Sequence, residues 1–373
     1  MIEQALAEIA AARGALDRAE ALLTQPVTTP PAPPPPQPIP APFADFRFAD
    51  AIEKRRAEHV PGAIGEGAYR FVANAHRFDH IDPFVFPGQR PDCHLHMFWG
   101  NLEIDEHSTI ESLMASGRSL SEGDLVNRSG YWMSALTIGD RAWLPDWVAN
   151  YYKLANPAKP SSPTQGDLSR IREMPNGLCM IFGNRLGDGT ASPHVWFTVN
   201  DPKQGLLWHK TTLAGAVPLL TAGRSLIVSV AAPQCWNGEL TSDDHRAHLA
   251  YPVQSGQRLV CPQTHPFVIP QVTYKAKFTV PPGVDMRALR ASSDEPDQAA
   301  GASVHAEYMG AHHPEAVKAW HENALLRQLD CSSADFGNGW GGKRHPTFTF
   351  ERPEKLVPFP SRFDPSRRIW ASI

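Results

Sequence analysis

SLIVSVAAP (residues 225–233) and VTYKAKFTV (residues 272–280) decide the fold class of this chain. Both runs are rich in β-branched and aromatic residues and are bounded by proline or glycine, which is the composition of β-strands. HVWFTV at 194–199 and RLVCP at 258–262 have the same character. Because the chain contains 36 prolines and 27 glycines, long loops must join these strands. We predict a mainly β fold, a β-sandwich or jelly-roll-like single large domain over residues 44–343.

Apolar residues with helical spacing occur in a few places only, among them residues 108–115, part of 208–222, and 315–329. Residues 344–373 are interrupted by prolines and are basic in patches. We predict that this last segment is an extended strap over the domain.

A seven-residue repeat over residues 2–23 predicts that residues 1–25 form a helix. Large residues occupy one position of the repeat and alanine its partner, namely Ile2, Ile9, Leu16 and Leu23 with Ala5, Ala12 and Ala19. This seam predicts an oligomerising helix and hence a homo-oligomer. The alternative is a single amphipathic helix that lies on its own chain, since about three heptads are short for a coiled coil. Residues 26–43 are dominated by proline and predict an extended linker.

The composition argues against two classes of partner. A net charge of −4 provides no basic field for nucleic acid, and no apolar run is long enough to span a membrane. The N-terminus alternates in charge, unlike a secretory signal, and therefore predicts synthesis in the cytoplasm. The five cysteines form no CxxC pair. Cys235 and Cys261 flank a histidine-rich segment and are candidates for one disulfide bond, but the absent export signal favours free thiols.

Three histidine-rich phrases are the candidates for chemistry: HLH at 94–96, DDHRAH at 243–248 and THP at 264–266. On a strand, residues 94 and 96 place both rings on one face, and residues 245 and 248 share one face of a helical turn. If the phrases converge, His94, His96 and His248 are candidate ligands of one divalent metal ion. The alternatives are imidazoles that act as acids, bases or substrate-binding groups, and buried histidines that only fix loops.

Longer phrases around these histidines resemble a protein family. They occur in the same order as DPFVFPG (82–88), HLHMFWG (94–100), SGYWMSAL (129–136), MPNGLCMIFGN (174–184), CWNGELTSDDHRAHLAYP (235–252), CPQTHPFVIPQ (261–271) and ADFGNGW (334–340). The chain is similar over about residues 79–342 to a domain of unknown function that is common in secreted fungal proteins, often beside WSC carbohydrate-binding modules. Because the domain occurs in secreted proteins beside these modules, the resemblance implies that cell-wall or other polysaccharides are the ligands.

The resemblance implies a shared site. The matching polar residues are His94, His96, Tyr131, Asn237, Asp244, His245, His248, Tyr251, His265 and Asp335. The chain departs from the pattern twice, because Ser333 stands where the family tends to have a histidine and Ser134 where proline is usual. A missing histidine would leave the catalytic set incomplete.

Polysaccharide chemistry can use these residues in two ways. A lyase would abstract a proton with a histidine or tyrosine while Arg246 offsets the uronate charge, whereas a glycoside hydrolase would need two carboxylates. The predicted catalytic residues are His245, His248, His265, Tyr131 and Asp244. The predicted substrate-binding residues are Trp99, Trp132, Trp236, Arg246 and Asn237, because sugar rings stack on indoles.

The sequence thus predicts a glycan-directed domain that binds or cleaves a polysaccharide or cell-surface glycan and is displayed on an oligomerising helix. The alternative is a non-catalytic structural or decoration protein of a larger particle, such as a bacteriophage virion, in contact with a capsid or other lattice.

Overall fold

The computed structural model describes residues 43, 45–55, 67–90, 93–116, 119–164, 166–184, 191–344, 349, 352–364 and 369–372. They belong to one compact unit, Pro38–Ile373. The oligomerising helix predicted over residues 1–25, and the linker predicted over 26–43 apart from Phe43, lie outside the described residues. In the part that is described, no helix is long and apolar enough to cross a membrane.

The first of two seven-stranded sheets contains three of the segments that the sequence predicts as strands. Its order is β11-β10-β12-β18-β8-β2-β21, and all neighbours are antiparallel except the parallel pair β2 and β21. The strands are β2 (Gly67–Ala73), β8 (Trp147–Leu154), β10 (Val195–Asp201), β11 (Gly205–Lys210), β12 (Ser225–Ala231), β18 (Gln271–Thr279) and β21 (Asp330–Ser333).

The second seven-stranded sheet is antiparallel throughout, in the order β25-β24-β3-β4-β5-β20-β9. Two strands from the C-terminal segment form one of its edges. The strands are β3 (Ala75–Asp79), β4 (His96–Gly100), β5 (Gly130–Ser134), β9 (Cys179–Gly183), β20 (His305–Met309), β24 (Ser361–Asp364) and β25 (Ile369–Ser372).

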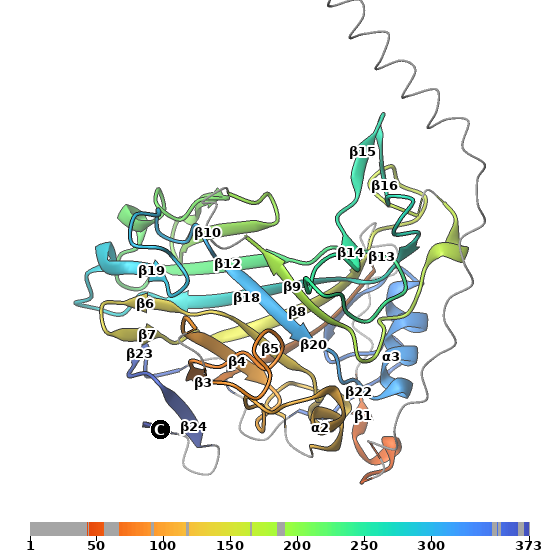
Figure 1. The fold of residues 1–373 in the computed structure, drawn as a ribbon, viewed down its shortest axis with the longest axis horizontal. Helices are drawn as coiled ribbons and strands as arrows, with labels where there is room; N and C mark the ends of the chain where they lie inside the picture. Colours follow the sequence, from red (N-terminus) through yellow and green to blue (C-terminus); the bar gives the residue numbers. More distant parts are fainter. Residues whose placement is uncertain are drawn as a thin grey trace, which may run out of the picture. The chain divides into compact units, whose positions relative to one another are not determined.

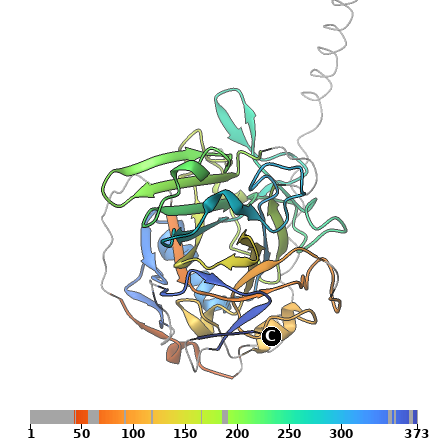
Figure 2. The ribbon, with the colours of Figure 1, turned by 90° about the vertical axis from the view of Figure 1, so that its left-hand side faces the viewer.

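The two sheets enclose the main hydrophobic core, as a β-sandwich does. Each sheet contributes one face to a single cluster of buried side chains, for example Tyr274 and Phe278 from β18 and Trp99 from β4. Figure 1 shows the two sheets with β10, β12, β18 and β8 in one and β3, β4 and β5 in the other. In Figure 2 the hairpin of β10 and β11 (green) lies at the upper left and the C-terminal strands (dark blue) lie in the lower half. The predicted mainly β, single-domain fold is confirmed.

Shorter sheets flank the sandwich. They are β1 (Ile52–Lys54) with β22 (Trp340–Gly342); β14 (Leu249–Ala250), β13 (Cys235–Trp236) and β17 (Phe267–Val268); β15 (Val253–Ser255) with β16 (Arg258–Val260); and β19 (Leu289–Ala291), β6 (Leu136–Ile138), β7 (Arg141–Trp143) and β23 (Leu356–Val357).

Helices are short and few among the described residues, and the sequence predicts them only in part. The predicted segment 108–115 contains α2, whereas 208–222 is mostly strand and loop and holds only η4. The segment 315–329 begins as α3 but changes to a π-helical turn, η6. The helices are η1 (Phe48–Asp50), α2 (Ile110–Ala115), η2 (Asp124–Val126), η3 (Leu168–Arg170), η4 (Val217–Leu219), η5 (Met286–Ala288), α3 (Pro314–Trp320) and η6 (His321–Leu325).

Cys235 and Cys261 form a disulfide bond, so the sequence-based preference for free thiols is wrong. The small sheet of β13, β14 and β17 brings the two cysteines together. Cys235 of β13 pairs with Val268 of β17, and Cys261 lies in the segment that leads into β17. Of the other described cysteines, Cys93 and Cys179 are free thiols.

The central strands of the second sheet place different chemistry on their two faces. In β4, Met97 and Trp99 point into the main core, whereas Phe98 joins a second cluster that packs under α2. Because successive side chains of a strand point to opposite faces, His96 lies on the same face as Phe98. This outer face carries the candidate site at one end and an apolar cluster at the other.

Candidate functional site

Two histidines stand side by side on the outer face of the second sheet. His96 begins β4 and lies opposite Ser134 of β5, while Ala306 of β20 pairs with Met133. His305, one residue earlier, therefore falls in the same row as Ser134 and His96. The serine side chain between them is small, and the two imidazole centroids are 6.1 Å apart.

His94 completes a group of three imidazoles. Its ring centroid lies 4.3 Å from that of His96 and 4.9 Å from that of His305. The two-residue spacing that the sequence predicts to bring His94 and His96 together does so. Gly183 of β9 pairs with His305 and has φ of +103°, and a Cβ there would lie 2.9 Å from the His305 Cα. Glycine at this position thus lets β9 pass close to the histidine.

Backbone carbonyls fix the orientation of two rings. The Nδ1–H of His96 donates to the Ile81 carbonyl at 2.9 Å, and that of His305 donates to the Ser303 carbonyl at 2.7 Å. Since a carbonyl only accepts, Nε2 is the free position of a neutral ring. Nε2 of His96 and Nε2 of His94 are buried and have no hydrogen-bond partner among the described residues.

Two buried carboxylates adjoin the imidazoles. Glu307 lies two residues along β20 from His305, and its Oε1 is 3.2 Å from the His305 Nε2, while Oε2 has no partner within the described ranges. Asp82, in the loop between β3 and β4, accepts the backbone N–H groups of Phe84 and Val85 at 3.1 and 3.0 Å. Ligand atoms of His94, His96 and His305 lie within 4.8 Å of one another, as do those of Asp82, His96 and Glu307. These five residues form the imidazole–carboxylate cluster.

Burial sets the charge of this cluster. Desolvation lowers the pKa of His96 to about 4, and burial together with the neighbouring His96 and His305 lowers that of His94 further. Burial also opposes charge on His305, but the Glu307 carboxylate outweighs it and raises that pKa. Burial raises the pKa of Asp82. Near neutral pH, His94 and His96 are therefore neutral rings with an available lone pair.

The cluster forms the floor of a cleft of about 860 Å³. Loops from three parts of the chain make its walls, and most of its rim is polar. The lining residues are Asp82, Val85, Phe86, Cys93, His94, His96, Ile181, Asp244, His245, Arg246, Ser292, Ser293, Asp294, Glu295, His305 and Glu307.

Backbone hydrogen bonds hold His245 at the rim in an unusual conformation. Its φ is +59°, in the left-handed region that few non-glycine residues adopt. Its N–H donates to the Ser242 carbonyl at 2.8 Å, and its ring centroid lies 4.4 Å from that of Phe84.

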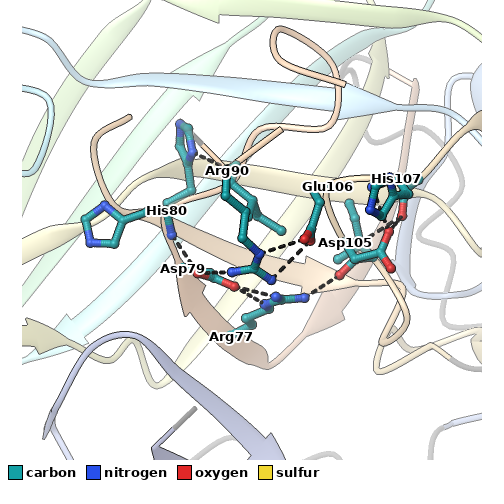
Figure 3. A network of polar contacts seen from close by, with 11 residues as sticks. Arg77, Asp79, His80, Arg90, Asp105, Glu106 and His107 are labelled. Atoms are coloured by element: carbon teal, nitrogen blue, oxygen red, sulfur yellow. Dashed lines mark hydrogen bonds and ion pairs between the residues drawn. The ribbon is translucent and has the colours of Figure 1, made fainter. Parts of the chain in front are cut away.

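A network of ion pairs anchors the loop that contributes Asp82 and His94 (Figure 3). Arg77 and Asp79 form a fully buried pair in β3, and Arg90 reaches from the loop to Asp79 and to Glu106. The Nδ1–H of His80 donates to the Cys93 carbonyl at 2.8 Å, which ties the two ends of the loop together. These contacts hold the described part of the loop at His80, Arg90 and Cys93.

The predicted site residues divide into two groups. His94, His96, Asp244, His245 and Arg246 line the cleft, so two of the three histidine-rich phrases converge.

His248 and His265 do not line the cleft. The buried His248 has Nδ1 2.9 Å from the Ser242 hydroxyl, and His265 donates from Nε2 to the Ala247 carbonyl at 2.9 Å. The metal grouping accordingly contains His305 in place of the predicted His248. Asn237 bonds to Glu239 within a tight turn and is likewise absent from the lining.

The three tryptophans predicted to bind substrate belong to the hydrophobic core instead. Trp99 and Trp132 are completely buried, and Trp236 is nearly so and donates from its indole to the Glu239 carbonyl. A buried indole offers no face to a sugar, so this prediction does not fit the structure. Tyr131 is also buried, with its hydroxyl 3.0 Å from that of Tyr152. The aromatic ring that the cleft exposes is Phe86, of which 37% is accessible.

The sequence does not predict three residues of the cluster, namely Asp82, His305 and Glu307. The spacing of His305 and Glu307, two apart in a β-rich segment, was the available signal. Ser333, by contrast, donates no group to the cleft; its hydroxyl accepts the N–H of Val72 at 3.0 Å in the first sheet. A histidine in place of Ser333, as the family pattern has, would therefore lie outside the cluster.

The molecule is a β-sandwich with an imidazole–carboxylate cluster at the floor of a cleft on one sheet. The chain belongs to the family described as "Domain of unknown function (DUF1996)", whose model matches residues 82–311. This range includes every residue of the cluster, from Asp82 to Glu307. No curated protein and no solved structure matches the chain.

Proposed function

We propose that the protein is a glycan-directed domain that binds a neutral saccharide chain in the cleft and hydrolyses it at the imidazole–carboxylate cluster. One observation carries this proposal: a polar, open cleft ends on neutral, buried imidazoles that have lone pairs to accept protons. A site that served only to stabilise the fold would gain nothing from an open approach.

The charge of the cleft selects the class of saccharide. Its lining contains the carboxylates of Asp82, Asp244, Asp294, Glu295 and Glu307 but the guanidinium of Arg246 alone. A uronic acid polymer would be repelled by this excess of negative charge, which argues against the lyase reaction. A neutral glycan, in contrast, can donate its hydroxyls to the carboxylates of the rim.

Phe86 supplies the apolar contact that a sugar ring needs. It is one of the few large apolar side chains exposed within the described residues, and it lies in the cleft wall. The CH face of a sugar packs on an aromatic ring in the same way as other apolar groups do. Phe86 therefore takes the role that the sequence assigns to the buried tryptophans.

Binding and product release with a panel of neutral and acidic polysaccharides test the proposal. We expect the protein to bind a neutral polymer and to release reducing ends from it, and Phe86→Ala to weaken binding by about tenfold. Trp340→Ala is the matched control, because Trp340 is also exposed but lies outside the cleft lining. His94→Ala should abolish product release while binding remains.

Preference for acidic polymers, or no binding to any polymer, would refute the proposal. Binding without product would refute hydrolysis and leave adhesion, the role expected of a decoration protein. The self-association that the repeat in residues 1–25 predicts would then multiply weak binding sites.

A further inference from the structure

We propose that His94, His96, His305 and Glu307 bind one divalent transition-metal ion at the floor of the cleft. The groups come from β4, the residues just before it, and β20. Ligand atoms of His94, His96 and His305 lie within 4.8 Å of one another, and so do those of His96, Glu307 and the neighbouring Asp82. Oε1 of Glu307 is also 3.2 Å from Nε2 of His305. A metal ion about 2.0–2.2 Å from each donor fits a set of this span.

The orientation of the rings is the first argument for an ion. His96 and His305 each donate Nδ1–H to a backbone carbonyl, and that bond leaves Nε2 as the ring atom available to a ligand. Metal-bound histidines are held in this manner, since the outer hydrogen bond fixes the tautomer and the ring plane.

The lack of protein donors is the second argument. The Nε2 atoms of His94 and His96 and Oε2 of Glu307 are buried and have no partner among the residues described. Nearby hydroxyls are engaged elsewhere: Ser292 donates to the Leu95 carbonyl at 2.5 Å, and Ser293 is 2.7 Å from Ser303. Buried acceptors without donors cost free energy, and a cation satisfies all of them at once.

Charge is the third argument. Asp82 and Glu307 are both buried, and the cluster contains neither lysine nor arginine. Two carboxylates this close are expensive to bury in a low dielectric unless a positive charge compensates them. A divalent ion compensates both, with Asp82 adding the second negative charge beside the four ligands.

The donor set selects the kind of ion. Three imidazole nitrogens and one carboxylate suit zinc, manganese, cobalt, nickel or iron, whereas calcium and magnesium prefer oxygen ligands alone. Because the cluster forms the floor of an open cleft, an ion there has a coordination position toward the solvent. The use of that position for hydrolysis rests on the proposed function, but the binding of the ion does not.

Metal binding to the full chain, without any glycan, tests the inference. The protein is treated with a chelator, dialysed, and titrated with Zn²⁺ and Co²⁺ by calorimetry and by the visible absorption of cobalt. We expect one ion per chain, a cobalt spectrum typical of nitrogen ligands, and a higher melting temperature in the presence of the ion. Mg²⁺ and Ca²⁺ should produce none of these effects.

Variants separate the cluster from the other histidines. His94→Ala and the isosteric Glu307→Gln should weaken binding by at least about 100-fold. His248→Ala is the matched control, because His248 is also buried with an unpartnered Nε2 yet lies outside the cluster. Circular dichroism of each variant reports folding, and Glu307→Gln keeps the shape of the side chain if His94→Ala unfolds the protein.

Three results would overturn the inference: no stoichiometric ion after reloading, equal binding of Ca²⁺ and Zn²⁺, or unchanged affinity in Glu307→Gln. Loss of polysaccharide binding alone would leave it intact and count only against the proposed function.

Discussion

Histidines at similar depth in this protein serve different purposes, and their partners distinguish them. Nε2 of His96 is buried and has no partner among the described residues, whereas Nε2 of the similarly buried His312 is 3.0 Å from the Tyr152 hydroxyl. Nε2 of His96 is therefore available to a ligand, whereas the hydrogen-bonding capacity of His312 is used within the core. Burial alone therefore does not identify a functional histidine. A missing partner marks a candidate ligand where other ligand groups lie nearby, as they do around His96 but not around the buried His248.

His312 makes the stability of the protein sensitive to acid. Burial lowers its pKa to about 3, below the value of about 6.5 in an unfolded chain. The unfolded state consequently binds the proton first, so stability is complete above about pH 6.5 and is lost as the pH falls toward 3. We expect His312→Gln to reduce the loss of unfolding free energy between about pH 7 and pH 5 by about 2 kcal/mol.

Urea unfolding at the two pH values measures this difference and cancels the cost of the substitution itself. His209→Gln is the control for the substitution itself, since His209 is exposed on β11. An identical pH dependence in wild type and His312→Gln would contradict the assignment.

At the scale of elements, ion pairs hold the loop between β3 and β4, which lines the cleft. Loops usually carry function because a scaffold positions them. Here the scaffold is the buried pair of Arg77 and Asp79, to which Arg90 attaches the loop (Figure 3). The two arginines differ in exposure, since Arg77 is buried and the Arg90 side chain is 52% exposed.

This difference predicts unequal effects of two substitutions. Asp79→Asn leaves the charge of Arg77 buried without a counter-ion and should lower the unfolding free energy by about 3–5 kcal/mol. Arg90→Gln removes only partly solvated ion pairs and should cost less than about 1 kcal/mol, while amide exchange in residues 82–90 becomes faster. Urea unfolding and hydrogen exchange measure the two effects; equal destabilisation by both changes would exclude this division of roles.

The sequence predicts elements better than contacts between elements. The strands at 225–231 and 271–279 follow from local composition, and the closeness of His94 and His96 follows from their two-residue spacing. The position of His305 next to His96 depends on two registers, that of β20 with β5 and that of β5 with β4. Neither register can be inferred from a local sequence pattern. The same limit explains the tryptophans, because a single strand does not reveal which of its faces a second sheet will cover.

For the whole molecule, the disulfide bond joins the cleft to the sandwich. Cys235 and Cys261 are 26 residues apart, and the segment between them contains Asp244, His245 and Arg246 of the rim. Compared with the central strands, this segment has little regular structure, namely the end of β13 and the short strands β14, β15 and β16. The covalent bond supplies the restraint that sheet hydrogen bonds provide elsewhere.

Removal of this bond should destabilise the protein. Closing a loop of this length is worth about 3–4 kcal/mol through the entropy of the unfolded chain. We expect the double variant Cys235→Ala, Cys261→Ala to unfold at lower urea concentration, and reductant to have the same effect on the wild type. Reductant should not affect the double variant; a reductant response that persists there would contradict the assignment of the effect to this bond.

The two faces of β4, β5 and β20 also limit which changes the gene can accept. Insertion of one codon within β4 would exchange the faces of every residue beyond it, so that Trp99 would enter the cleft side and Phe98 the interior. Substitutions can alter the cleft and the core one at a time, but an insertion or deletion in these strands alters both at once. Length variation among related genes should therefore fall in the loops, and the spacing from His94 to Gly100 should stay constant even where the residues between them differ.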